Sequence, residues 1–282
     1  MSMSDHIRTL DLAGGAPEAA SEALGKIYDD ALDAVILRRF FPADAVAMAQ
    51  SALAASVDEG WRRPNKPVPG IDIRLIGEVA TPTATTPTGP GEGEYFDAVS
   101  RNRQATRSLF PADFDPFDSL ESGLAMTAGG RPVELASHTD GRPFAACSVR
   151  SLRDGQGIFL HHDYHYPLPL YGDLAPRLDT TTCISFFVVL QQPTDGGRLC
   201  VYALKPGEEG DLPRLPHGFL DQQAVDATVP YTFFDLQDGD LIAFGSGRLY
   251  HRIEPVVGAR SRVTMGGFLA FDATRERVLY WS

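Results

Sequence analysis

The sequence has few cysteines and no pattern that would pair them. Its three cysteines are Cys147, Cys183 and Cys200, and no Cys-x-x-Cys occurs. The number is odd and two of the three lie in apolar runs, so we expect buried free thiols in a reducing compartment. This argues against a disulfide-stapled secreted domain and favours a cytoplasmic location.

Long apolar runs and an excess of basic residues are also missing. No stretch approaches the roughly 18 apolar residues of a membrane span. Residues 1–20 show no apolar stretch between a basic start and a cleavage site, as a signal peptide would. The net charge of −12 repels phosphate backbones. We therefore expect neither a membrane nor nucleic acid as a partner.

What is present fits one globular domain over residues 1–282. Apolar residues make up 43% of the chain and charged residues 22%, which allows a sizeable core. Near the start, Pro17 to Asp33 predicts a helix and Ala34 to Phe41 a buried strand. A second helix is expected from Pro42 to about Val57, with apolar residues at helical spacing.

Residues 62–95 differ in composition from their surroundings. Proline, glycine and threonine dominate Arg62 to Gly70 and Thr81 to Pro90, which predicts loops and no regular element. A flexible linker is one interpretation. An ordered loop that forms an active-site lid is the other, and the two stay open.

From Pro143 onward, short β-branched and aromatic runs alternate with turn residues. The predicted strands are Phe144–Leu152, Ile158–His161, Thr182–Gln191, Leu199–Tyr202, Tyr231–Phe234, Asp240–Phe244, Tyr250–Pro255 and Arg262–Ala270. This succession favours a mainly β fold with helical additions, a double-stranded β-helix or jelly roll. We expect residues 1–142 to form an N-terminal helical layer with the lid region, and residues 143–282 to form the jelly-roll core.

A possible metal site begins at the end of one predicted strand. His161 and Asp163 are two residues apart, so on an extended chain their side chains lie on the same face. His251 is the candidate for a third ligand. Two histidines and one carboxylate on one face of an octahedron leave three positions open, an arrangement diagnostic of non-haem Fe(II) oxygenases.

His-x-Asp alone is a weak signal, because His138-Thr-Asp140 matches it too. That second match stands just before Gly141 and Pro143 and is interpreted as a turn. The sequence around His251 selects the first match instead.

A binding site for a dicarboxylate is predicted downstream of His251. Arg262 offers a bidentate fork to a carboxylate, and Thr264 adds a hydroxyl two residues further on. Arg260 is a competing cation, but it lacks a partner like Thr264 that leads into an apolar strand. Arg150 is a further candidate for a cosubstrate contact, with a structural ion pair as the alternative.

Taken together, these residues resemble the Fe(II)/2-oxoglutarate oxygenase superfamily. The resemblance is closest to the branch of aliphatic halogenases that chlorinate welwitindolinone- and ambiguine-type alkaloids. It is concentrated between Phe244 and Ser282, in Gly247-Arg-Leu-Tyr-His-Arg-Ile-Glu-Pro-Val-Val-Gly258 and Gly266-Gly-Phe-Leu-Ala-Phe271. It implies a jelly roll that uses Fe(II), 2-oxoglutarate and dioxygen.

The resemblance also assigns roles to single residues. It implies that His161 and His251 bind iron, that Arg262 and Thr264 bind 2-oxoglutarate, and that Ile158 lines the substrate pocket. Ser185 falls where the family has a serine that is thought to influence the orientation of the oxidised iron.

One position departs from the family pattern. The halogenases have glycine where this chain has Asp163, and glycine leaves room for chloride on the iron. We therefore expect hydroxylation of an unactivated C–H bond of a small molecule, with succinate and carbon dioxide as co-products. A halogenase or other group-transfer oxygenase is one alternative, and a non-catalytic jelly-roll binding protein is another.

The residues that follow the metal motif form a Pro-bounded loop rich in aromatic residues. They are a packed loop in one interpretation and a substrate wall in the other, with Tyr166 as the best candidate for substrate contact. His165 flanks Asp163 on the other side at the same spacing as His161, but its position beyond the strand makes it the weaker ligand candidate.

Overall fold

The computed structural model describes residues 6–12, 17–55, 74–76, 92–163, 172–216 and 218–282. The predicted lid at residues 62–95 falls largely outside these ranges, and its ordered or flexible character stays a prediction. Its described parts are β3 (Arg74–Ile76) and the start of α4 (Glu92–Arg107).

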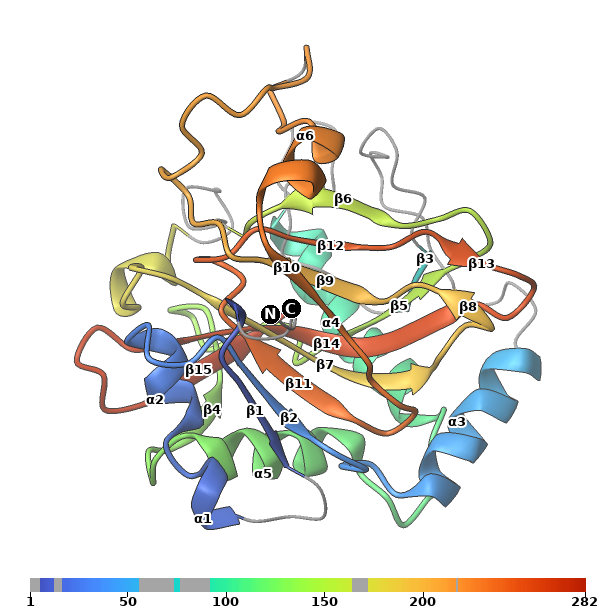
Figure 1. Ribbon diagram of the computed structural model, residues 1–282. Coiled ribbons are helices and arrows are strands. Elements are labelled where there is room, and N and C mark those ends of the chain that lie inside the picture. Colours follow the sequence, from blue (N-terminus) through green and yellow to red (C-terminus); the bar gives the residue numbers. More distant parts are fainter. Residues whose placement is uncertain (1–5, 13–16, 56–73, 77–91, 164–171, 217) are drawn as a thin grey trace.

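A nine-stranded major sheet forms the centre of the molecule (Figure 1). Its central strands are β7 and β14, which run antiparallel to each other. In order along the sheet, the strands are β1 (Thr9–Leu12), β2 (Ala34–Leu37), β11 (Leu241–Phe244), β7 (Ile184–Gln191), β14 (Arg262–Phe271), β15 (Val278–Trp281) and β4 (Val133–Leu135). Strand β5 (Ser148–Leu152) also pairs with β14 and carries β3 on its other edge.

A four-stranded minor sheet faces the major one. Its order is β10 (Tyr231–Phe234), β9 (Leu199–Tyr202), β12 (His251–Ile253) and β6 (Ile158–His161). A short ribbon of β8 (Asp195–Gly196) and β13 (Val256–Val257) closes one end. The major sheet is antiparallel except for the parallel pairs β1–β2 and β15–β4, and the minor sheet is antiparallel. Two facing sheets of this kind are the jelly roll that the sequence predicts.

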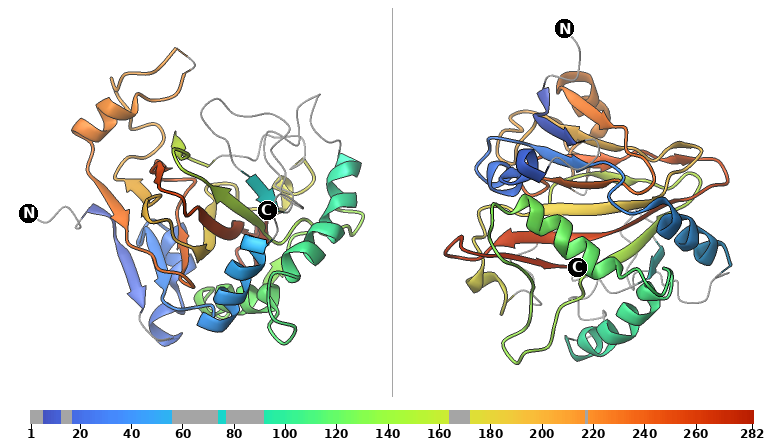
Figure 2. Two further views of the ribbon diagram at one scale, coloured as in Figure 1. Left: turned by 90° about the vertical axis from the view of Figure 1, so that its right-hand side faces the viewer. Right: turned by 90° about the horizontal axis from the view of Figure 1, so that it is seen from below.

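Helices cover the outer faces of the two sheets (Figure 2). Besides α4, they are α1 (Pro17–Ala20), α2 (Ala23–Tyr28), α3 (Ala43–Ala55), α5 (Pro116–Thr127), α6 (Gln222–Thr228) and the 3-10 turn Ala175–Arg177. Helices α3, α4 and α5 pack on the major sheet, and α6 on the minor sheet. Among the described helices, none combines the length and apolar character needed to cross a membrane.

Alternate side chains of strand β7 are buried on opposite faces of the major sheet. Ile184, Phe186 and Val188 belong to the core beneath the helices, whereas Phe187 and Val189 belong to the core between the sheets. This is the two-residue alternation of a strand buried on both faces.

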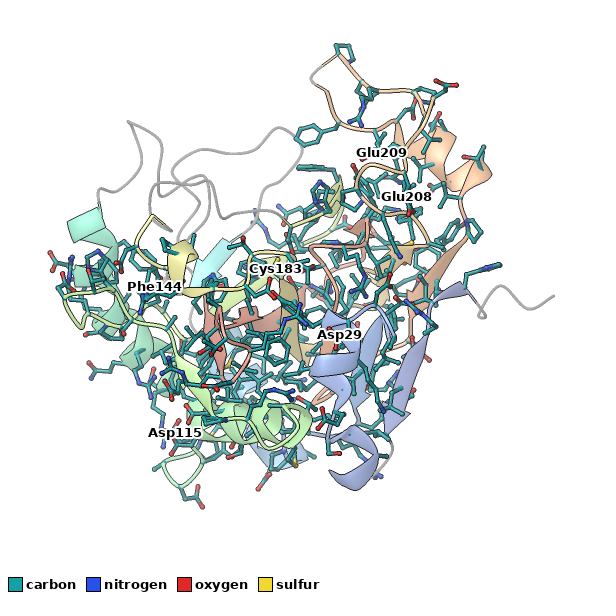
Figure 3. All side chains as sticks on the ribbon, turned by 90° about the vertical axis from the view of Figure 1, so that its left-hand side faces the viewer. Asp29, Asp115, Phe144, Cys183, Glu208 and Glu209 are labelled. Carbon is teal, nitrogen blue, oxygen red and sulfur yellow. The ribbon has the colours of Figure 1, made fainter. Side chains whose placement is uncertain are left out.

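Side chains fill the interior on both sides of the sheets (Figure 3). Cys183 lies inside the molecule, and all three cysteines are free and buried, as predicted. Asp115 lies at the periphery, where its carboxylate accepts hydrogen bonds from the backbone N–H groups of Phe117 and Asp118 and so caps α5.

The helical elements near the start are shorter than predicted. The helix expected over Pro17 to Asp33 is broken into α1 and α2, and it ends before Asp30, whose φ of 60° is incompatible with a continuing helix. The following strand ends at Leu37, because Arg39 has a φ of 50° and begins the turn into α3.

The first part of the chain also supplies strands that the sequence analysis did not identify. Strands β1, β3 and β4 were not identified, and together with the predicted β2 they pair into the major sheet, so the region before residue 143 contributes both helices and strands. The single domain over 1–282, with its division into a helical layer (1–142) and a core (143–282), stays a prediction.

The close approach of β7 and β14 depends on Gly266. A Cβ atom at this position would lie 2.1 Å from the carbonyl oxygen of Phe186 and 2.6 Å from the Cβ of Phe187. We expect Gly266→Ala to lower the free energy of unfolding by about 2 kcal/mol, because neighbouring backbone has to move. Gly25→Ala is the control, since its Cβ would make only an ordinary 3.5 Å contact with the Glu22 carboxylate. Equal denaturant midpoints for the two variants would contradict this account.

Candidate metal centre and cosubstrate pocket

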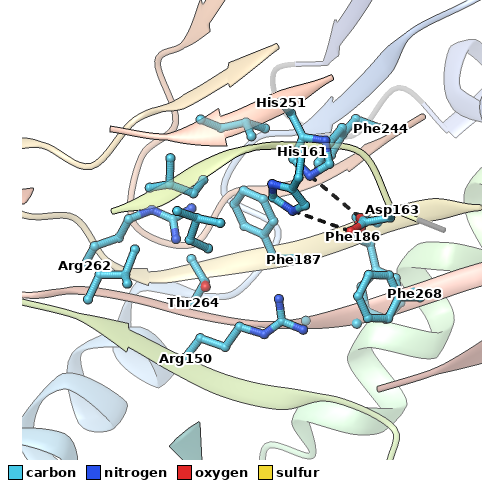
Figure 4. Close-up of a pocket in the computed structure, with 17 residues that line it drawn as sticks. Arg150, His161, Asp163, Phe186, Phe187, Phe244, His251, Arg262, Thr264 and Phe268 are labelled. Atoms are coloured by element: carbon cyan, nitrogen blue, oxygen red, sulfur yellow. Dashed lines mark hydrogen bonds and ion pairs between the residues drawn. The ribbon is translucent and has the colours of Figure 1, made fainter. Parts of the chain in front are cut away.

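The structure brings His161, Asp163 and His251 together between the two sheets (Figure 4). His161 ends β6, His251 begins β12, and the two residues are directly opposite in the antiparallel register. The Nε2 atom of His161 lies 3.6 Å from Asp163 Oδ1, and the Nε2 atom of His251 lies 3.8 Å from Asp163 Oδ2. One donor atom from each residue lies within 4.8 Å of the others, which is close enough to surround one ion.

Both imidazoles are oriented by their own strands. The Nδ1 atom of His161 lies 2.7 Å from the Phe159 carbonyl oxygen, and that of His251 lies 3.1 Å from the Leu249 carbonyl oxygen. When each Nδ1–H donates to its carbonyl, each Nε2 presents its lone pair to the centre. Burial, reinforced by the neighbouring His161, lowers the pKa of His251 to about 4, so this imidazole is neutral at pH 7 and suited to binding a cation.

Asp163 lies just beyond the end of β6, held by a turn from the major sheet. Its backbone N–H donates to the Ser246 carbonyl oxygen at 2.9 Å. Gly247 makes this approach possible, because a Cβ there would lie 3.1 Å from the Asp163 carbonyl oxygen and 2.6 Å from the Cys183 nitrogen. The Ser185 hydroxyl donates to Asp163 Oδ2 at 2.7 Å.

A pocket extends from these three residues along the inner face of the major sheet. Arg262 and Thr264 point into it from alternate positions of β14, as the sequence predicts. Arg150 stands opposite Thr264 on β5 and also lines the pocket. The predicted substrate contacts Ile158 and Ser185 lie in its wall as well.

Arg262 is a buried cation, with only 5% of its surface exposed. Burial, helped by the positive charge of Arg150, lowers the pKa of Arg262 to about 10, so it remains charged at pH 7. Its guanidinium carbon lies 5.0 Å from the centroid of the Phe187 ring. Within the described ranges no carboxylate forms an ion pair with it, so it suits an incoming carboxylate.

Arg150 is tied to its own strand and to an aromatic neighbour. Its Nε donates to the Ser148 hydroxyl at 3.2 Å, and its guanidinium carbon lies 5.7 Å from the centroid of the Phe268 ring. Both interpretations, cosubstrate contact and structural partner, are compatible with these contacts.

The competing candidates for metal and cosubstrate binding lie elsewhere. His138 Nδ1 lies 3.1 Å from Asp140 Oδ1, and Arg142 pairs with the same carboxylate within one turn. Arg260 forms an ion pair with Asp238 and does not line the pocket. Tyr166 and the other residues of 164–171, including His165, fall outside the described ranges.

Four phenylalanines that line the pocket were not identified from the sequence. They are Phe186, Phe187, Phe244 and Phe268. Phe187 follows Ser185 at a spacing of two on one strand, so alternation alone could have placed it on the same face. Phe244 and Phe268 both pair with Ser185 from neighbouring strands, and nothing in the sequence specifies that register.

Comparison with known proteins agrees with the fold. Among solved structures, an N-substituted L-amino acid dioxygenase from Burkholderia ambifaria AMMD is similar, with 12% identity, a TM-score of 0.51, and 91% of this chain and 90% of that chain covered. The same enzyme in complex with α-ketoglutarate, another name for 2-oxoglutarate, matches at 15% identity and a TM-score of 0.51 over 92% and 90% of the two chains. A carbocyclase of nogalamycin biosynthesis, SnoK, matches at 12% identity and a TM-score of 0.50 over 92% and 89%.

The class of protein follows from the fold together with a family comparison. The chain is an Fe(II)/2-oxoglutarate-dependent oxygenase, an oxidoreductase whose cofactors are Fe(II) and 2-oxoglutarate. The model of the carrier-protein-independent halogenase WelO5 family matches residues 8–282, so the chain belongs to that family. Among curated protein sequences, none matches this chain.

The two His-x-Asp motifs allow a matched test of metal binding. We expect His161→Ala to weaken Fe(II) binding by tenfold or more, because the site loses one of three donors; outer-sphere changes alone cost roughly 10- to 100-fold in metal sites. His138→Ala should leave the Fe(II) dissociation constant unchanged. Anaerobic titration of each purified variant with Fe(II) measures the difference. An equal loss of Fe(II) affinity in both variants would refute the assignment of the metal site to His161-x-Asp163.

Proposed function

We propose that this protein hydroxylates an unactivated C–H bond of a small molecule, and that His161, Asp163 and His251 hold the iron. The observation that carries the proposal is the His-Asp-His cluster, with Asp163 and His251 buried and His161 half-buried, at one end of a pocket whose other end holds the buried cation Arg262. The donor set fits Fe(II), because two imidazoles and a carboxylate suit a non-haem iron with open positions.

When bound, Fe(II) with 2-oxoglutarate and dioxygen supplies the oxidation of the C–H bond and releases succinate and carbon dioxide. The chain itself binds and orients the reactants. Arg262 pairs with the distal carboxylate of 2-oxoglutarate, and the Thr264 hydroxyl donates a second hydrogen bond to it. Arg150, opposite Thr264, adds a second positive charge on the same face.

Apolar side chains keep water away from the reacting atoms. Phe244 contacts the His251 ring, with centroids 5.0 Å apart, and Ile158 and Phe187 line the wall between the metal end and the Arg262 end. Water exclusion strengthens the ion pair with Arg262 and protects the oxidising site from side reactions.

The WelO5-type halogenases make chlorination the competing candidate. The residue at position 163 distinguishes the two candidate reactions. The resemblance places glycine here in the chlorinating relatives, whereas Asp163 brings a third protein ligand and the negative charge that chloride would bring. We infer hydroxylation for this chain because its carboxylate lies within 4 Å of both imidazoles.

For the substrate, we propose only a chemical class and the segments that would contact it. Tyr166 and the lid at residues 62–95 are proposed to complete the substrate wall. A bulky apolar alkaloid of the kind that the halogenases accept, or an N-substituted amino acid as the structural neighbour's name indicates, is a reasonable first probe. The three free, buried cysteines support a reducing compartment such as the cytoplasm.

The role of Arg262 is testable against that of its neighbour Arg260. Arg262→Gln removes the cation, so the KM for 2-oxoglutarate should rise by about tenfold or more, as expected for losing a charged hydrogen-bonding partner. Arg260→Gln should keep the native KM, because its guanidinium pairs with Asp238 away from the pocket. Succinate formation as a function of 2-oxoglutarate concentration gives both values. A native KM for Arg262→Gln would show that Arg262 does not bind the distal carboxylate of 2-oxoglutarate.

The choice between hydroxylation and chlorination is testable by mass spectrometry. With Fe(II), 2-oxoglutarate, dioxygen and excess chloride, the native protein should add oxygen to its substrate and form no chlorinated product. Asp163→Gly should lose hydroxylation and gain chloride-dependent perturbation of the visible band of the anaerobic Fe(II)–2-oxoglutarate complex. Chlorinated substrate as the main product of the native protein would show that Asp163 does not bind iron.

A further inference from the structure

The turn between β11 and β12 contacts two of the three candidate metal ligands. Its Ser246 carbonyl oxygen accepts a hydrogen bond from the Asp163 backbone N–H at 2.9 Å. Three residues later, the Leu249 carbonyl oxygen lies 3.1 Å from His251 Nδ1. The conformation of this turn, residues 245–249, therefore affects where Asp163 and His251 lie relative to each other.

The turn is attached to the chain on both of its sides. In the major sheet, β11 lies between β2 and β7. On the β7 side, the Gly247 N–H donates to the Cys183 carbonyl oxygen at 3.0 Å. On the β2 side, the Gly245 N–H donates to the Asp33 carbonyl oxygen at 3.0 Å. The side chain of Arg248 adds to this second attachment, because it extends to the chain between α2 and β2.

The guanidinium of Arg248 binds two backbone carbonyl groups at once. Its Nη1 donates to the Ile27 carbonyl oxygen near the end of α2, and its Nη2 donates to the Leu32 carbonyl oxygen at 3.1 Å. A guanidinium is planar and holds its donors in a fixed fork, so two such bonds fix the direction of the side chain. A lysine ammonium has no fork of this kind.

Arg248 also lies beside two carboxylates, but one of them is already paired. Its Nε lies 3.2 Å from Asp30 Oδ1, and its Nη2 lies 3.6 Å from Asp33 Oδ1. The Asp33 side chain is only 4% exposed, and Arg8 donates to its two oxygens at 2.7 and 3.0 Å. Asp33 would thus keep a counterion without Arg248, so neutralising this buried charge is not the main contribution of Arg248.

We propose that Arg248 is a positioning residue that anchors the turn of residues 245–249 and thereby sets the spacing of Asp163 and His251 as a pair of iron ligands. The proposal rests on the proposed function, because it takes these two residues as iron ligands. A purely structural role is the competing explanation, in which the arginine stabilises the fold by balancing buried negative charge.

The other end of the same strand pair offers a matched control. Strands β2 and β11 pair along their whole length, and Arg38 follows β2 at the end away from the turn. Arg38 pairs with the buried Asp240 and with Asp11, and it donates to the Asp235 carbonyl oxygen at 2.7 Å. Its side chain is 22% exposed, against 13% for Arg248, so the two arginines are similarly sheltered from water.

Backbone amide exchange in the metal-free protein tests the anchor directly. The Asp163 amide reports on the turn beside Arg248, and the Asp240 amide, which donates at 3.0 Å to a carbonyl oxygen of its own turn, reports on the Arg38 end. Arg248→Gln should speed exchange of the Asp163 amide by about tenfold and leave the Asp240 amide unchanged, since the loss of charged hydrogen bonds makes local opening easier. Arg38→Gln should do the reverse. Nuclear magnetic resonance of protein labelled with ¹⁵N-aspartate follows both amides in one sample.

Anaerobic Fe(II) titration tests the consequence for the metal site. The Fe(II) dissociation constant should rise about tenfold in Arg248→Gln, as for other changes behind the metal ligands, and stay native in Arg38→Gln. Arg248→Lys keeps the charge but loses the fork, so it should bind Fe(II) as weakly as Arg248→Gln. The thermal unfolding midpoint of each metal-free variant shows that it is folded. If Arg248→Gln does not fold, Arg248→Lys takes its place in both comparisons.

Three results would overturn the proposal. Native exchange of the Asp163 amide in the Arg248 variants would show that the arginine does not hold the turn. Native Fe(II) affinity in Arg248→Lys would show that the positive charge alone suffices. Equally lowered unfolding midpoints in Arg248→Gln and Arg38→Gln, with equal Fe(II) affinities, would establish the structural role. A native protein that binds no Fe(II) would instead contradict the proposed function, whereas the metal-free amide exchange still decides whether Arg248 anchors the turn.

Discussion

The register between β6 and β12 is the constraint on which the site depends. It sets His161 opposite His251 and turns both imidazoles toward the major sheet. A slip of one residue would turn one histidine to the other face of the minor sheet, where Leu160, Cys200 and Tyr202 form a separate apolar cluster. The packing of the two sheets on each other then brings Asp163 and the inner face of β14 to the same pocket. The positions of the proposed metal ligands, of Arg262 and of the apolar wall are therefore consequences of strand pairing among the described residues.

The pocket buries charged groups among apolar side chains, which costs desolvation free energy. A guanidinium and a carboxylate are buried at its two ends, each at about the same exposure as the surrounding phenylalanines. Such groups are costly to remove from water, and the burial lowers the pKa of Arg262 and of His251. In the proposed function, a divalent cation at one end and a dicarboxylate at the other bring charges of opposite sign that offset this cost. The pocket therefore has a negative charge at one end and a positive charge at the other, and each would be balanced by a bound ligand of opposite charge.

Much of this arrangement can be predicted from local sequence. Strands β6, β9 and β10 have the predicted bounds, because short β-branched and aromatic runs stand between clear turns. The two-residue alternation of a strand is enough to predict that Arg262 and Thr264 share one face of β14. Strand β1 and helix α4 were not predicted, since β1 is a short run with charged residues and α4 emerges from a segment rich in proline and glycine. The Ser185–Asp163 contact could not be predicted at all, because it joins two sheets across 22 residues and depends on the twist and packing of both.

Asp163 lies just beyond the end of β6, and its backbone N–H donates to the Ser246 carbonyl oxygen. Any amino acid other than proline supplies that N–H, so the position tolerates a change of side chain without loss of the sheet. Codons for aspartate and glycine differ by a single base. If Asp163 binds iron as proposed, a gene of this family lies one mutation away from a different set of iron ligands. The feature that decides the chemistry is also among the easiest for evolution to change, which explains how one fold hosts oxygenases of divergent outcome.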